Sequence, residues 1–246
     1  KHVDKASMTP WQKAWHFIWY EDSIWSWLAN IVIAFLLIKF IVYPLLGLLL
    51  GTQLPVVAVI SNSMEHRTAP LCDEQSLIDG SCLVYTDGAY EICGKLYQEK
   101  TRLSFDQYWL LCGDYYEQEG IEKAQWEQDF PFKNGFLKGD VIILSSARPE
   151  KLEVGDVLVF ESSVDANYAR PYPIIHRIIN IYEEGGQTMY ETKGDFNDRQ
   201  IESIYLNESS ITQSQVIGKG AVRIPYIGYV KLVFVDIITF LGGLFS

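Results

Sequence analysis

The hydrophobic positions of this chain form a long apolar stretch near the start, several short β-branched runs, and a second apolar stretch at residues 231–246. Residues 24–50 contain a single charged residue, Lys39, and about 20 apolar residues are enough to cross a bilayer core. We therefore predict a transmembrane helix over residues 23–50, with a tilt or a kink at Pro44. A cleaved signal sequence is the competing interpretation, but no small-residue cleavage site follows.

The segment before this helix is rich in aromatic residues. Five of the seven tryptophans lie there or at the start of the span, a composition typical of a membrane–water interface. Thr9 and Pro10 match an N-cap followed by proline at the first helical position, so we predict an interfacial helix over residues 10–20. Residues 1–22 are then a cytoplasmic or interfacial segment. They carry more lysines than the residues just after the span, so the positive-inside rule predicts a cytoplasmic N-terminus.

The second apolar stretch, residues 231–246, is interrupted by Lys231 and Asp236 and is short for a complete span. We expect it to be membrane-associated. It could be an amphipathic helix, a re-entrant piece or the start of a longer span.

Between the apolar ends, the pattern predicts a mainly β outer domain formed by residues 51–65 and 138–230. Short β-branched and aromatic runs bounded by Gly, Asp or Pro are typical of strands. Five such runs are residues 56–60, 141–145, 157–161, 173–182 and 188–193. The second and third runs each follow a Gly-Asp pair and are joined by a polar loop, so we predict that they form a hairpin.

Residues 66–137, which separate the two parts of this domain, differ in composition. Residues 65–139 carry 14 acidic and 7 basic side chains, a net charge of −7 (7 minus 14) within a chain total of −11. Such an acidic chain is not expected to bind nucleic acid. We predict an α-helical or irregular insertion with a helix near residues 121–129, whose acidic face is either solvated or contacts a basic partner.

All four cysteines, Cys72, Cys82, Cys93 and Cys112, lie in this insertion. Their spacings do not match the C-x-x-C pattern of metal or redox sites, so we predict no zinc site. An even number of cysteines in one insertion suits two disulfides in an oxidising compartment. Three connectivities are possible, and the alternative is four buried free thiols.

Residues 56–66, VVAVISNSMEH, end a predicted strand in two serines. Taken alone, Ser63 reads as a turn residue, because Ser and Asn side chains bond to nearby backbone. A serine becomes a nucleophile when an adjacent base takes its proton. His176, on the apolar face of a predicted strand, is either a core histidine or such a base. His66 is a competing base, but we expect its imidazole to be exposed and mobile.

Three carboxylates follow in T-K-G-D-F-N-D-R-Q-I-E, at Asp195, Asp198 and Glu202. A carboxylate on the far imidazole nitrogen would fix the tautomer of His176 and stabilise its charged form. Asp195 could equally be a turn residue, and Asp198 could pair with Arg199.

The order of these motifs resembles the type I signal peptidases, in the archaeal and endoplasmic-reticulum branch that uses histidine as the base. An anchor is followed by V-V-A-V-I-S-N-S-M-E, then G-D-V-L-V-F, I-I-H-R and T-K-G-D-F-N. The resemblance covers residues 54–64 and 139–228 and leaves most of residues 66–137 uncovered. Four motifs in order behind an anchor are a stronger signal than any one of them.

The resemblance implies that Ser63 is the nucleophile, His176 the general base, and Ser61 an oxyanion donor together with the Ser63 backbone N–H. It also implies an Asp of K-G-D, here Asp195, as the acid. The family has a second Asp some six residues later, where this chain has isoleucine, so Asp198 or Glu202 could substitute. Asn and His replace the Gly and Pro of the family pattern S-G-S-M-E-P.

We therefore predict a membrane-bound serine endopeptidase that needs no metal or organic cofactor. Its partners would be secretory preproteins and the lipid of the cell membrane, or of the endoplasmic-reticulum membrane in a eukaryote. The domain after the anchor would lie on the extracytoplasmic side, with a shallow apolar pocket for small residues. The alternative is a membrane-tethered, non-catalytic β-domain that binds a partner through the acidic insertion.

Overall fold

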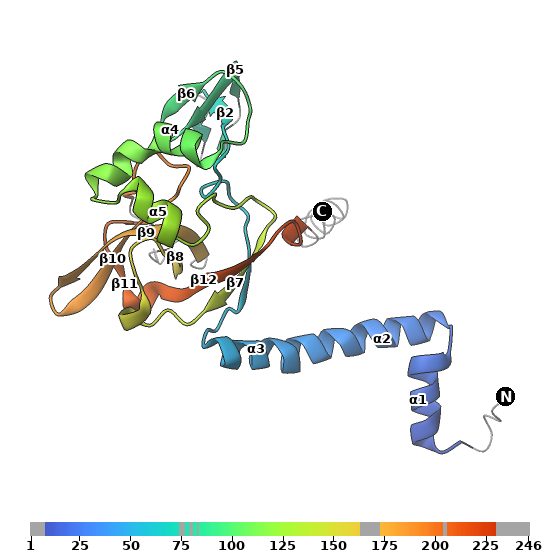
Figure 1. Ribbon diagram of the computed structural model, residues 1–246. Helices are drawn as coiled ribbons and strands as arrows, with labels where there is room; N and C mark the ends of the chain where they lie inside the picture. Colours follow the sequence, from blue (N-terminus) through green and yellow to red (C-terminus); the bar gives the residue numbers. More distant parts are fainter. Residues whose placement is uncertain are drawn as a thin grey trace. The chain divides into compact units, whose positions relative to one another are not determined.

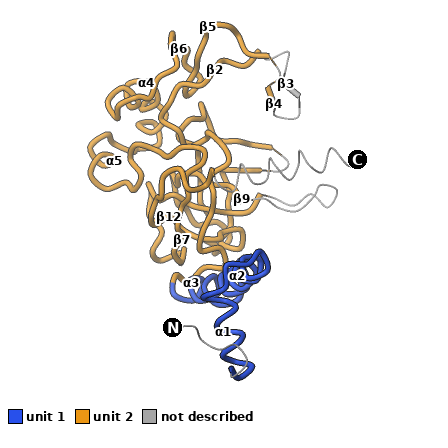
Figure 2. The backbone as a smooth tube through the Cα atoms, turned by 90° about the vertical axis from the view of Figure 1, so that its right-hand side faces the viewer, with its two compact units in different colours: residues 1–49 blue, residues 50–246 orange. Residues whose placement is uncertain are grey.

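A computed structural model describes residues 8–73, 77–78, 81–82, 84–162, 173–203 and 206–229 of the chain. The chain forms two compact units, residues 1–49 and residues 50–246 (Figure 2). The predicted membrane-associated segment 231–246 lies outside the described residues, so it stays a prediction.

The first unit is helical. Its elements are α1 (Pro10–Tyr20), α2 (Ile24–Leu37), a π-helical segment (Ile38–Val42) and α3 (Tyr43–Leu50), the last of which runs into the second unit. The α1 helix begins where predicted: Thr9 caps it, and Gln12 completes a capping box. Among the described residues, the helix formed by residues 24–50 is the one that is long and apolar enough to cross a membrane, with a mean hydropathy of 2.5 over its apolar window.

Helix α1 is attached to α2 by two side-chain hydrogen bonds. Ser26 Oγ donates to the carbonyl of Phe17 at 2.5 Å, and Asn30 Nδ2 donates to the carbonyl of Ile18 at 2.9 Å. These bonds satisfy carbonyls in the last turn of α1, which have no partner within that helix. The pair therefore meets at a bend held by specific contacts.

The second unit is mainly β, which confirms the predicted fold class. One sheet has the strand order β1-β7-β12-β8-β9-β10-β11, and all neighbours are antiparallel (Figure 1). Each of the five predicted runs forms a strand of this sheet. The strands are β1 (Val56–Ala58), β7 (Val141–Ser145), β8 (Val157–Glu161), β9 (Pro173–Glu184), β10 (Gln187–Lys193), β11 (Ile211–Thr212) and β12 (Val216–Ile224). Two 3₁₀ turns span Pro149–Lys151 and Gln213–Gln215.

The predicted hairpin between residues 141–145 and 157–161 is wrong, because β12 lies between β7 and β8. The aspartates of the two Gly-Asp pairs explain the arrangement. Each accepts a backbone N–H three residues earlier, and each also pairs with a basic residue of β12 at 2.7 Å: Asp140 with Arg223, and Asp156 with Lys219. The Gly-Asp pairs therefore predicted the start of each strand correctly. They did not indicate that both strands pair with β12, whose two basic residues lie more than 60 residues after the aspartates.

The insertion contains more regular structure than predicted. Its elements are β2 (Ala69–Cys72), β3 (Leu77–Ile78), β4 (Ser81–Cys82), β5 (Tyr85–Ile92), β6 (Lys95–Tyr97), α4 (Phe105–Gln118) and α5 (Lys123–Asp129). Strands β2, β5 and β6 form a separate sheet, and β3 pairs with β4. The α5 helix confirms the predicted helical patch, whereas α4 was missed.

Two disulfides join the four cysteines, as Cys72–Cys82 and Cys93–Cys112. The prediction of two bridges is confirmed, and the connectivity is sequential.

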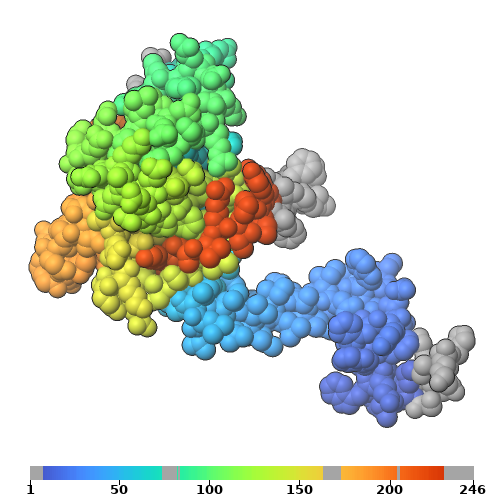
Figure 3. Space-filling view, in the orientation of Figure 1, coloured from blue at the N-terminus to red at the C-terminus, as the bar shows by residue number. Residues whose placement is uncertain are grey.

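The insertion packs on the main sheet through an aromatic core. Tyr108, Tyr116 and Trp126 are fully buried and cluster with Ile179 of β9. In the space-filling view, the green surface of the insertion lies directly above the orange-red band of β12 (Figure 3). Insertion and sheet therefore belong to one compact unit.

Candidate active site

Ser63 lies in a tight turn just after β1. Glu65 N–H donates to the carbonyl of Asn62 at 2.9 Å, which closes the turn, and the buried side chain of Met64 anchors it in the core. The N–H of Phe196 donates to the carbonyl of Ser63 at 2.8 Å, so the segment after β10 fixes the serine from a second side. Ser61 Oγ is 3.1 Å from Ser63 Oγ, within hydrogen-bond distance.

An apolar groove of about 470 Å³ runs past these serines. Ser61, Ser63 and His176 all line it. Its apolar walls come from the β1 region, the start of β9 and the loop before β11: residues 54 and 56–60, residues 173–175, and Ile201 and Leu206. Because β1 is the edge strand of the sheet, the described residues leave one side of it unpaired beside the groove.

His176 is the fourth residue of β9 and is 3% exposed. Its Nδ1 is 2.5 Å from Oε1 of Glu208. A Cβ added to Gly194 would lie 2.8 Å from the carbonyl oxygen of Ser63 and 3.0 Å from Nε2 of His176. Glycine at this position thus lets the chain pass close to both groups. Within the described part of the chain, no hydrogen bond joins Ser63 Oγ to His176 Nε2; such contacts are often long in enzymes without bound substrate.

Glu208 is completely buried and accepts hydrogen bonds from three donors. Besides His176, these are Thr192 Oγ1 at 3.0 Å and the N–H of Ile201 at 2.7 Å. A carboxylate that accepts from Nδ1–H fixes the neutral imidazole with its Nε2 lone pair free to take a proton.

Glu208 was not among the carboxylates predicted from the sequence. It lies 32 residues after His176 and 13 residues after Asp195, beyond the six-residue spacing implied by the family pattern. A signal was present, however: the expected second acid was absent at its usual place, and the polar loop that follows contains further carboxylates.

The structure brings neither Asp195 nor Asp198 to His176. Successive side chains of a strand point to opposite faces, and Asp195 bonds to the neighbour of the histidine, Arg177, which donates from Nε at 2.9 Å and from Nη2 at 2.8 Å. Asp198 forms an ion pair with adjacent Arg199, and the exposed Glu202 bridges to the backbone of the same loop. The one carboxylate that faces His176 among the described residues is Glu208.

Burial alone would raise the pKa of Asp195. The charge of Arg177 and the hydrogen bonds from His66 and Arg177 outweigh this and hold the pKa well below its ordinary value. Asp195 is therefore a permanent anion on the face of the sheet away from the His176–Glu208 pair.

His66 is buried, with 2% exposure, so the prediction of an exposed imidazole is wrong. Its Nε2 is 3.0 Å from Asp195 Oδ2, and its ring stacks on Tyr108 at a centroid distance of 3.5 Å. Burial lowers the pKa of His66, although the hydrogen bond to Asp195 opposes the shift. The insertion folds back over the imidazole. This burial was not expected, because His66 lies at the start of a polar segment.

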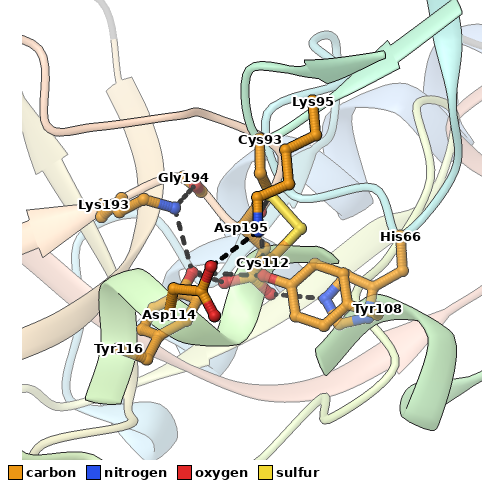
Figure 4. The surroundings of a disulfide bond; sticks show 10 residues. All are labelled: His66, Cys93, Lys95, Tyr108, Cys112, Asp114, Tyr116, Lys193, Gly194 and Asp195. Carbon is orange, nitrogen blue, oxygen red and sulfur yellow. Dashed lines mark hydrogen bonds and ion pairs between the residues drawn. A yellow bond between two sulfur atoms is a disulfide. The ribbon is translucent and has the colours of Figure 1, made fainter. Parts of the chain in front are cut away.

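Helix α4 of the insertion contacts Asp195 directly (Figure 4). Tyr108 Oη donates to the Asp195 carbonyl at 2.8 Å, and Tyr116 Oη lies 3.4 Å from Oδ1. Lys193 Nζ donates to Tyr116 Oη at 3.3 Å, and burial lowers the pKa of Lys193 to about 8. The Cys93–Cys112 bridge ties this helix to the end of β5. The part of the chain that the structure describes contains no group of His, Cys, Asp and Glu suited to a metal ion.

Comparison with known proteins gives one consistent result. The chain is 28% identical over 103 residues to the signal peptidase complex catalytic subunit SEC11C of Homo sapiens, covering 41% of this chain and 51% of that protein. Over 99 residues, or 39% of this chain, it is 28% identical to SEC11 of Colletotrichum graminicola and 30% identical to SEC11 of Lodderomyces elongisporus, covering 55% and 56% of those proteins.

The chain is a homologue of signal peptidase catalytic subunits. This confirms the family resemblance seen in the order of the motifs. The chain spans about half the length of the curated signal peptidase relatives that it matches. No protein-family model matches the chain.

Proposed function

We propose that this chain is a membrane-bound serine endopeptidase that removes N-terminal signal peptides from secretory preproteins. Ser63 is the nucleophile, His176 the general base, and Glu208 the carboxylate that orients His176. The observation that carries the proposal is that His176, which pairs with a buried carboxylate, lines the same groove as Ser63. The homology to signal peptidase catalytic subunits supports the substrate class.

In this mechanism, the Ser63 hydroxyl attacks the scissile carbonyl while Nε2 of His176 accepts its proton. His176 then gives the proton to the leaving amine, and water hydrolyses the acyl-enzyme by the same route. Glu208 stabilises the imidazolium in each step without taking its proton. Ser61 Oγ and the Ser63 backbone N–H supply the oxyanion donors, which are worth about 3 kcal/mol each.

The substrate lies as an extended peptide beside the free edge of β1, with small side chains in the apolar groove. The 27-residue apolar helix holds the enzyme in the membrane, where signal peptides are presented. The lysines before this helix support a cytoplasmic N-terminus, with the serine site on the extracytoplasmic side.

Replacing Ser63 tests the assignment. In full-length protein reconstituted in vesicles, we expect Ser63→Ala to lower preprotein cleavage by about 10³-fold or more, because no other group replaces the nucleophile. A gel assay with a preprotein carrying an Ala-x-Ala site measures this. Cleavage by Ser63→Ala at the wild-type rate would refute the proposed function, as would a wild-type chain that cleaves no preprotein.

Replacing Glu208 tests the choice of acid. We expect Glu208→Gln to lower kcat by about 10² to 10⁴-fold, because an amide does not stabilise the imidazolium. Glu202→Gln, in the same loop but exposed, is the matched control and should retain wild-type kcat. If Asp198→Asn lost activity while Glu208→Gln kept it, the acid would be Asp198 instead.

A further inference from the structure

The loop between β10 and β11 contributes two side chains to the groove. Ile201 is 39% exposed and Leu206 is 6% exposed, and both line the groove beside the serines and His176. Leu206 packs in the apolar cluster beneath the sheet with Leu158 and Ile174. Ile201 therefore presents a partly open branched side chain to the groove, while Leu206 forms part of its fixed floor.

Glu208 holds this loop in place. Its Oε2 accepts the N–H of Ile201 at 2.7 Å, and its own N–H donates to the carbonyl of Ile201 at 3.0 Å. Both oxygens of one buried carboxylate are thus engaged, Oε1 with His176 and Oε2 with the backbone of the groove wall. The position of Ile201 is consequently fixed relative to the imidazole.

We propose that Ile201 is a specificity-determining residue, whose side chain limits the size of the substrate side chain accepted at the first or the third position before the scissile bond. This inference rests on the proposed function. The backbone of Ile201 is held by two hydrogen bonds to Glu208, one to its buried carboxylate and one from its backbone N–H, so this wall cannot retreat without disturbing the group that orients His176. A bulky substrate side chain therefore meets a rigid obstacle, and a small one does not.

The test compares peptide substrates on full-length protein in vesicles. The peptides span one signal-peptide cleavage site and carry Ala, Val, Leu or Phe immediately before the scissile bond, or at the third position before it. For Ile201→Ala we expect the ratio of kcat/KM for Leu over Ala to rise at least about tenfold at one of these positions, since one methylene in an apolar pocket changes discrimination by 10- to 200-fold. Ile201→Val should give a smaller rise, and Ile201→Phe a fall.

Leu110→Ala is the matched control. Leu110 is 78% exposed on α4 and does not line the groove, so its variant should keep the wild-type ratio. Wild-type ratios at both positions in all three Ile201 variants, with active wild-type enzyme, would overturn this inference and leave the proposed function standing. A wild-type chain that cleaves none of the peptides or preproteins would overturn the proposed function, and the inference with it.

Discussion

Buried beside the nucleophile turn, His66 is held between a permanent anion and an aromatic ring. Its Nε2 faces Asp195, while Nδ1 is the buried side-chain polar atom that has no hydrogen-bond partner among the described residues. A proton on Nδ1 would place a positive charge next to Arg177 without a partner for the new N–H. The folded protein therefore holds His66 neutral.

This neutrality makes stability dependent on pH. The unfolded chain takes up a proton at His66 near pH 6.5, whereas the folded chain does so only at lower pH. As pH falls through 6.5, the unfolded state binds more protons, so the free energy of unfolding should decrease by up to about 1.4 kcal/mol per pH unit. We expect His66→Gln to lack this component, because glutamine can donate to Asp195 but does not titrate.

Urea unfolding of both proteins in detergent from pH 7.5 to 5 measures the difference. The pH dependence of the unfolding free energy should differ between wild type and His66→Gln only below about pH 6.5. Parallel curves across the whole range would show that the imidazole is not held neutral.

Residue type and order were enough to predict two of the three groups of the proposed site. Taken alone, Ser63 read as a turn residue and His176 as a core histidine or a base; the order of the motifs along the chain singled out both residues. The third group could not be found in this way. Glu208 reaches His176 because β9, β10 and the loop after them bring the two together, and Asp195 is diverted by Arg177 on the opposite face. Which carboxylate faces His176 depends on the register of the strands, and the positions of carboxylates in the sequence do not reveal that register.

Within the insertion, helix α4 contacts the segment after β10, and that segment also bonds to the Ser63 carbonyl. It supplies Tyr108 and Tyr116 to the Asp195 cluster, and Cys112, in the same helix, is bonded to Cys93. The hydrophobic pattern did not predict this helix, because its buried face consists largely of aromatic residues and has no regular aliphatic stripe. Aromatic residues have only a modest helix propensity.

The two disulfides should therefore differ in importance. The Cys93–Cys112 bridge joins residues 19 positions apart and closes a loop that contains the part of α4 before Cys112. The double variant Cys93→Ala/Cys112→Ala should lower the free energy of unfolding by about 3 kcal/mol and reduce preprotein cleavage. The Cys72–Cys82 bridge joins two residues that are 10 positions apart in the sequence, and neither belongs to the aromatic core. Its double alanine variant is the control and should retain cleavage. Thermal unfolding and the preprotein assay together measure both effects, and equal losses of cleavage in the two variants would contradict this view.

At the scale of the whole molecule, the tryptophans fall into two populations. Trp11, Trp15, Trp19, Trp25 and Trp27 are 60–85% exposed in the first unit. Trp109 and Trp126 are 7% and 0% exposed in the second. Exposed aromatic side chains at this density are expected at the headgroup level of a bilayer.

Fluorescence distinguishes the two populations. In vesicles containing brominated lipid, we expect the five exposed tryptophans to account for most of the quenching, because quenching requires contact with lipid. Trp109→Phe/Trp126→Phe should keep this quenching, and replacement of the other five by phenylalanine should abolish it. Equal quenching in the two variants would rule out insertion of the first unit into the bilayer.

The strand order also has a consequence for biosynthesis. Ser63 follows β1, which pairs with β7, whereas His176 belongs to β9, which pairs with β8; in the main sheet, β12 alone joins these two halves. Chains are made from the N-terminus, so both halves emerge before residues 216–224 are available. We expect a ribosome-bound chain to lack an assembled nucleophile and base until that last strand inserts. Under the proposed function, translation itself would therefore set the time at which the chain becomes able to cleave a substrate.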